Sequence, residues 1–175
     1  MKRLTLTGII IGTAVLTVAI GVEAATLTVT LTEQVVLNGQ EKGATNSLTV
    51  SDVTEVSQRI VNVPTSEVII LAMGTAVAAG QFDEDDVRYI RITNKDDTNH
   101  VTLTFRNENN DECIHLLDAG HSFIYGGDNS GGVKNTHDAD STAINRGVNV
   151  MGDLVDITAL ADTAACDLEL FVAGV

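Results

Sequence analysis

The sequence has no tryptophan and only four phenylalanines and two tyrosines among its 175 residues. Its core must therefore be aliphatic, built mainly from Val, Ile, Leu and Ala. A chain so poor in aromatic rings has few side chains that could stack on sugars, which disfavours a glycosidase or a lectin. The abundance of Val and Thr favours β-strands.

Basic residues are also few, with 10 Lys and Arg against 24 Asp and Glu, for a formal net charge of -14. Such a chain repels phosphate backbones, so nucleic-acid binding is disfavoured. We expect its partners to be bound through apolar surfaces or sheet edges rather than by charge steering.

Only two cysteines are present, Cys113 and Cys166, and a single pair is not a disulfide framework. They could form one disulfide if their strands lie side by side. The interpretation we favour is that both are small, buried apolar side chains.

The short signatures of catalysis are missing: the sequence contains no P-loop, no zinc-ligand cysteine spacing, no Gly-x-Ser-x-Gly elbow and no His-Glu-x-x-His. We therefore predict that the protein is not an enzyme and needs no cofactor. His115, His121 and His137 leave a metal site as an alternative, but the interpretation we favour is that they are strand and turn residues.

Two acidic runs, at residues 83–86 and 96–97, offer the oxygen ligands that calcium requires. Neither run has EF-hand spacing. Charged turns at strand ends are the interpretation we favour, with calcium as the alternative.

Residues 1–24 differ from the rest of the chain, because Lys2 and Arg3 precede an uncharged run at residues 4–22. Val22 and Ala24 suit cleavage before Ala25, as in a secretory signal peptide. A membrane anchor is a second interpretation, since the run approaches the roughly 20 residues of a membrane span. The third is an assembly arm that pairs with a neighbouring subunit through Leu4, Ile9, Ile10, Ile11, Val15, Leu16, Val18 and Ile20.

From residue 25 the sequence reads as short strands separated by turns. Residues 25–31 alternate apolar side chains with Thr, which predicts one buried face, and Asn38-Gly39 is typical of a tight turn. Further strands are predicted at residues 47–51, 55–63, 67–72, 87–93, 100–106, 113–117, 122–125, 155–160 and 168–172.

The polar segment 94–99 predicts a hairpin between residues 89–93 and 101–105. Residues 126–132 and 134–140 are predicted to form an exposed loop. The number and spacing of the strands predict an all-β domain at residues 25–175, a single antiparallel β-sandwich that is jelly-roll-like, preceded by the hydrophobic arm or leader.

Several stretches resemble segments of small β-sandwich virion proteins. They are Val63-Pro-Thr-Ser-Glu-Val68, Tyr89-Ile-Arg-Ile-Thr-Asn-Lys-Asp-Asp-Thr-Asn-His-Val101, Leu117-Asp-Ala-Gly-His-Ser-Phe123 and Asp156-Ile-Thr-Ala-Leu-Ala-Asp-Thr-Ala-Ala-Cys-Asp-Leu-Glu-Leu170. Over residues 25–175 the chain is similar to structural proteins of tailed phages that infect cyanobacteria.

This resemblance implies a virion surface component, of the capsid decoration, cement or fibre type, that binds copies of itself and other capsid or tail proteins. It assigns no functional residue. The alternative is a secreted or cell-surface β-sandwich, such as an adhesin or filament subunit, exported by the N-terminal leader. A membrane is a partner only if that leader is an anchor.

Overall fold

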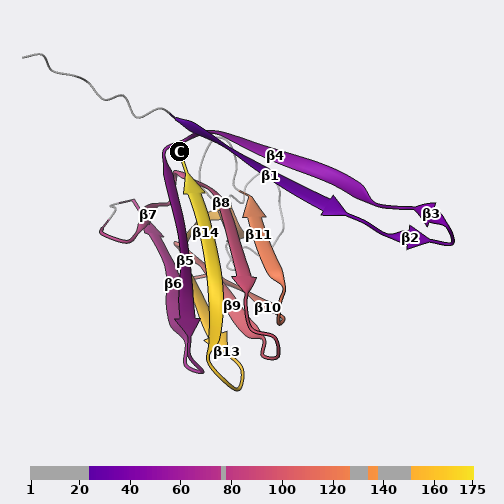
Figure 1. The fold of residues 1–175 in the computed structure, drawn as a ribbon. Coiled ribbons are helices and arrows are strands. Elements are labelled where there is room, and N and C mark those ends of the chain that lie inside the picture. The colour runs from indigo at the N-terminus through magenta and orange to yellow at the C-terminus, as the bar shows by residue number, and fades with distance from the viewer. Residues whose placement is uncertain (1–23, 76–77, 127–133, 138–150) are drawn as a thin grey trace, which may run out of the picture.

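The structure is a computed structural model, and it describes residues 24–75, 78–126, 134–137 and 151–175. Two sheets pack face to face in this part of the chain, and every strand pair in them is antiparallel except the parallel pair β6–β7 (Figure 1). The four-stranded sheet has the order β11 (Ser122–Gly126), β8 (Val87–Asn94), β14 (Cys166–Gly174), β5 (Glu55–Val63). The six-stranded sheet has the order β10 (Glu112–Leu117), β9 (Val101–Asn107), β13 (Met151–Ala161), β6 (Val68–Gly74), β7 (Phe82–Asp83), and β12 (Lys134–His137) pairs with β13.

The core lies between these two sheets and is largely aliphatic, as the composition predicts. Alternate residues of each central strand point inward, because successive side chains of a strand face opposite sides of the sheet. In β9, for example, Val101, Leu103 and Phe105 are buried while Thr102 and Thr104 between them are not. The largest fully buried side chains include Phe105, Leu71, Ile90, Ile92, Leu103, Leu154, Ile157, Leu168 and Leu170.

The predicted hairpin between β8 and β9 is wrong. β8 pairs with β11 and β14, whereas β9 pairs with β10 and β13, so residues 95–100 arch from one sheet to the other. Residues 118–121 make the same crossing between β10 and β11. The two-stranded ribbon that β8 and β11 begin therefore continues in the opposite sheet as β9 and β10, which is the folded-ribbon arrangement of a jelly roll.

Four such arches gather at one end of the sandwich: residues 64–67, 95–100, 118–121 and 162–165 (Figure 1). Backbone hydrogen bonds tie them to one another and to the adjoining ends of β8 and β14. Asp162 N donates to His100 O over 3.2 Å, and Lys95 N donates to Asp167 O over 2.8 Å. Asn94 N donates to His121 O over 2.9 Å. This end is called the arch end below.

The other strand predictions are confirmed within a few residues, and the all-β sandwich is correct. The predicted loop at 134–140 is wrong for residues 134–137, which form β12. A polar segment becomes a strand there because β13 extends to Met151 and offers it a backbone partner. The remainder of the predicted loop, at residues 127–133 and 138–140, lies outside the described residues, as does the leader at 1–23.

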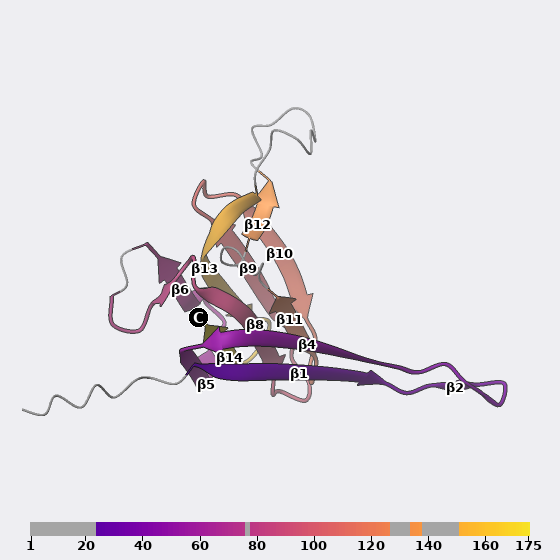
Figure 2. The same ribbon diagram turned by 90° about the horizontal axis from the view of Figure 1, so that it is seen from above.

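A long hairpin leaves the sandwich at the end opposite to the arches. It consists of β1 (Ala25–Glu33) and β4 (Ala44–Val53), and it ends in a small tip of β2 (Val36–Leu37) and β3 (Gln40–Glu41). Figures 1 and 2 show it crossing the outside of the four-stranded sheet and then projecting far beyond the edge of the sandwich. Residues 25–53 are called the arm below.

Candidate functional site

The arm has one apolar and one hydroxyl-bearing face, because residues directly opposite each other in the antiparallel pair share a face. Leu27 lies opposite Val50, and Val29 lies opposite Leu48. Leu31 continues this row toward the tip. These five residues are called the apolar stripe. The opposite face pairs Thr28 with Thr49, Thr30 with Ser47, and Thr32 with Thr45.

The part of the stripe nearest the sandwich is covered by the molecule's own sheet. Val50, Val53, Tyr89 and Ala173 form a second buried cluster, and Leu27, Val29 and Phe171 pack against it. The rings of Tyr89 and Phe171 meet edge to face with their centroids 6.0 Å apart. The base of the arm is thus fixed to the outer face of β8 and β14 by apolar packing.

The outward part of the arm has no such cover. Leu31 is 50% exposed and Leu48 is 43% exposed, and at the tip Val35, Val36 and Leu37 are 51, 65 and 59% exposed. An isolated two-stranded hairpin is at best marginally stable in water. Contiguous exposed apolar surface on a soluble chain marks an interaction site. The outward part of the arm is therefore the best candidate for a functional surface.

The tip is built by local sequence, as predicted. Asn38 and Gly39 both have positive φ, 53° and 74°, which is the geometry of the tight turn that this dipeptide favours. Gly43 is required for a different reason: a Cβ atom at this position would lie 2.2 Å from the carbonyl oxygen of Glu33. The two sides of the hairpin therefore approach each other too closely at Gly43 for any side chain.

Sequence reasoning placed the assembly element elsewhere, in Leu4, Ile9, Ile10, Ile11, Val15, Leu16, Val18 and Ile20, all of which lie outside the described residues. It predicted residues 25–31 as a strand of the sandwich domain with one buried face. One signal of the arm was available. Residues 24–32 and 43–51 contain no charged side chain, which is unusual in a chain with a net charge of -14.

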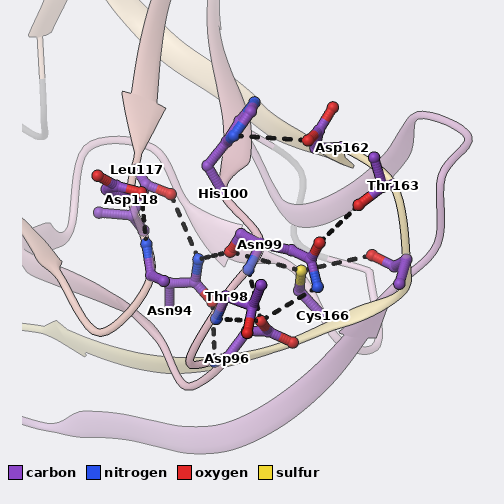
Figure 3. Close-up of polar contacts among 12 residues, drawn as sticks. Asn94, Asp96, Thr98, Asn99, His100, Leu117, Asp118, Asp162, Thr163 and Cys166 are labelled. Carbon is purple, nitrogen blue, oxygen red and sulfur yellow. Dashed lines mark hydrogen bonds and ion pairs between the residues drawn. The ribbon is translucent and has the colours of Figure 1, made fainter.

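A second cluster of polar side chains lies at the arch end (Figure 3). Asn94 is fully buried, and its Nδ2 donates hydrogen bonds to Asn99 O over 2.9 Å and to Leu117 O over 3.3 Å. Its Oδ1 accepts from Asp96 N over 3.0 Å. The Thr163 hydroxyl donates to Asn99 Oδ1 over 2.6 Å. The side chain of Asn94 therefore joins two arches, and Asn99 joins them to a third.

The arch-end cluster contains residue types used in catalysis, but its contacts are those of turns. Asp96 accepts the backbone N–H groups of Thr98 and Asn99, and these hydrogen bonds lower the pKa of its carboxyl group. His100 Nδ1 lies 3.7 Å from Asp162 Oδ2. Burial, and then the nearby Asp96, Asp162 and Asp167, raise the pKa of the Cys166 thiol. A thiol held protonated is a poor nucleophile and a poor metal ligand.

The two cysteines are both free, so the structure contains no disulfide between Cys113 and Cys166. Cys166 is fully buried at the start of β14, in agreement with the apolar interpretation. Cys113 lies on β10, in the opposite sheet, and is partly exposed. Its Sγ is 3.4 Å from His115 Nε2.

The ring of His115 is held in an aromatic cluster at the open edge between β10 and β11. Its centroid lies 5.6 Å from that of Phe105 and 5.0 Å from that of Phe123. Cys113, His115 and Leu117 share one face of β10, as the alternation of the sequence predicts. This packing accounts for His115 without a ligand.

Acidic side chains gather where β7 meets β8. Glu84 is 8% exposed, and burial raises the pKa of its carboxyl group, with further increases from Asp153, Asp85, Glu108 and Asp83. Among the described residues, no three His, Cys, Asp or Glu side chains are grouped so that they could hold a metal ion. In this part of the chain, residues 83–86 and 96–97 therefore do not form a set of calcium ligands.

The chain matches no family model, no curated protein and no solved structure. The resemblance to virion proteins thus depends on the quoted sequence segments alone. No helix in the part of the chain that the structure describes has the length and apolar character of a membrane span.

Proposed function

We propose that the protein is a non-enzymatic structural subunit that assembles with copies of itself on the surface of a phage virion, as a capsid decoration, cement or fibre-type component. The observation that carries the proposal is the projecting arm, whose apolar side chains are covered at the base and exposed beyond it. The resemblance of residues 63–68, 89–101, 117–123 and 156–170 to phage structural proteins supports the virion as the location.

The magnitude of the exposed surface supports a role in binding. Full burial of a Leu or Val side chain stabilises by about 1.5–3 kcal/mol, so the exposed halves of Leu31, Val35, Val36, Leu37 and Leu48 correspond to about 5 kcal/mol in total. Association itself costs about 4–15 kcal/mol. A single arm contact is therefore marginal, and stable assembly requires an apolar receiving surface and several contacts per subunit.

Charge favours the arm as the contact between copies. Two subunits that each carry a net charge of -14 repel each other across most of their surface. Residues 24–32 and 43–51 are uncharged, so they can approach a second copy without adding to this repulsion.

Mass spectrometry of gradient-purified particles and of clarified medium from the native source tests the proposal. The expected result is this chain at high copy number in the particles. The protein found free in the medium, with Ala25 as its first residue, contradicts the virion role.

The leader sequence favours a second candidate function, an exported adhesin or filament subunit. Lys2, Arg3 and the uncharged run at residues 4–22 have the pattern of a signal peptide. The same measurement separates the two candidates, because the exported subunit is expected outside the cell and processed before Ala25.

A further inference from the structure

The outer face of the six-stranded sheet is a second uncovered apolar surface. Ile69, Ile114, Leu116 and Leu160 project from it and are 62, 63, 66 and 38% exposed. They are called the outer patch below. The strand register places them in two neighbouring rows, the first of which is Ile114, Thr104, Thr158 and Ile69. The second row is Leu116, Thr102 and Leu160.

The outer patch resembles the arm in its chemistry. Both rows are built from aliphatic and threonine side chains. The charged groups beside them are Arg106, which binds Asp156 and Glu112 over 3.0 and 2.8 Å at the border, and Glu67, whose carboxylate accepts a hydrogen bond from the buried Thr158 hydroxyl over 2.5 Å. Residues 25–32 and 43–51 of the arm are uncharged, so they add no repulsion against Glu67.

The arm cannot reach the outer patch of its own molecule. Its base is packed on the four-stranded sheet, and the outer patch lies on the far side of the sandwich (Figure 2). Any contact between the two surfaces must therefore join different copies of the chain.

We infer that the arm of one copy docks on the outer patch of the next copy, with its apolar stripe facing the sheet. This inference rests on the proposed role as a self-assembling subunit and names the surface that receives the arm. Continuity with packing already present supports it, because Leu27, Val29 and Val50 show the same stripe covering a sheet face of this fold. The threonine face of the arm stays in solvent.

The contact uses two different surfaces, so it is either exchanged between two copies related by a two-fold axis or repeated head to tail, which closes into rings or grows into filaments. Each copy gives one arm and receives one, so that every subunit in a closed ring makes two contacts. This doubles the apolar area buried per subunit relative to a pair joined by a single arm.

A complementation experiment with the full chain tests the inference. The arm variant carries Leu31→Asp and Leu37→Asp, and the patch variant carries Ile114→Asp and Leu116→Asp. Each changes two side chains that are at least half exposed. By light scattering, the wild type is expected to be an oligomer and each variant alone a monomer of 18.4 kDa. An equimolar mixture is expected to contain pairs of twice that mass, in a share that rises with protein concentration, because one intact arm meets one intact patch through a single marginal contact.

Matched controls separate this contact from a general effect of added charge. Val56→Asp with Ile60→Asp places the same charges at two exposed apolar residues of β5, which belong to neither surface. Thr30→Asp changes the solvent face of the arm. Both controls are expected to assemble as the wild type does. Circular dichroism checks that each variant is folded. If the aspartate patch variant does not fold, Ile114→Ala with Leu116→Ala is used in its place.

The outcomes that overturn the inference differ from those that overturn the proposed function. An oligomeric patch variant beside a monomeric arm variant means that the arm binds elsewhere, and the subunit role stands. A mixture of two monomeric variants that stays monomeric up to the highest protein concentration measured means that arm and patch do not bind each other, which also refutes the inference. A wild-type chain that is monomeric at every concentration refutes the assembling role itself.

Discussion

Replacement of Asn94 by Ala is predicted to destabilise the sandwich by about 3 kcal/mol. The side chain makes three hydrogen bonds at a fully buried position, to the backbone of Asn99, Leu117 and Asp96. Each contributes about 1 kcal/mol net, and the alanine leaves carbonyl groups without their donor inside the protein. For a domain whose total stability is about 5–15 kcal/mol, the loss is a large fraction.

The assay is equilibrium unfolding in urea, followed by circular dichroism at one fixed protein concentration, since assembly adds to apparent stability. With a slope of about 2 kcal/mol per molar urea, the midpoint is expected to fall by about 1.5 M without a change in slope. Asn62→Ala is the matched control. Asn62 is exposed and donates a single hydrogen bond, over 2.8 Å, to Asp167, so it should cost at most about 0.5 kcal/mol. A loss below about 1 kcal/mol for Asn94→Ala, or equal losses for both, refutes the reasoning.

Three further predictions follow from the geometry. Gly43→Ala places a methyl group 2.2 Å from the Glu33 carbonyl oxygen and should weaken assembly in light scattering while the urea midpoint of the sandwich stays unchanged. Glu84→Gln should raise the urea midpoint at pH 7, because a raised pKa means that the folded state disfavours the ionised carboxylate. In a thiol-reactive dye assay, Cys113 should react in the native protein and fully buried Cys166 only after unfolding.

Each of these has a control or a contradicting result. Gly74→Ala adds a methyl group with no atom within 4 Å and should leave assembly intact. The gain from Glu84→Gln should shrink as the pH falls below the ordinary glutamate pKa of 4.5, where the carboxyl group becomes protonated in both folded and unfolded chains. A gain that persists at pH 3 contradicts the electrostatic explanation. Two equally reactive thiols in the native protein contradict the burial of Cys166.

The strands were predictable because their signals are local. Residues 55–63 were predicted as one strand and β5 has the same bounds, and in β9 the alternation of Val, Leu and Phe with Thr identifies the buried face. The turn at Asn38-Gly39 follows in the same way from the backbone preferences of two residues.

The pairing of strands was less predictable. Residues 94–99 have the composition of a hairpin turn, yet the strands on either side belong to different sheets. A short polar segment can close a hairpin between neighbouring strands or arch across the roughly 10 Å between packed sheets. The choice depends on partners distant in sequence, among them Leu117, whose carbonyl oxygen accepts from the buried Asn94 side chain.

The candidate site, too, was predictable in its local sequence features but not in its place in the fold. The sequence by itself determined an acidic, aliphatic, all-β chain with an uncharged, threonine-rich segment after residue 24. Only the tertiary structure decided that this segment leaves the sandwich, with Leu27 and Val29 covered and Leu31 exposed in one continuous stripe. Alternation determines which side chains share a face. Whether that face is covered depends on where the other strands lie, and their positions are determined only when the sheets pack.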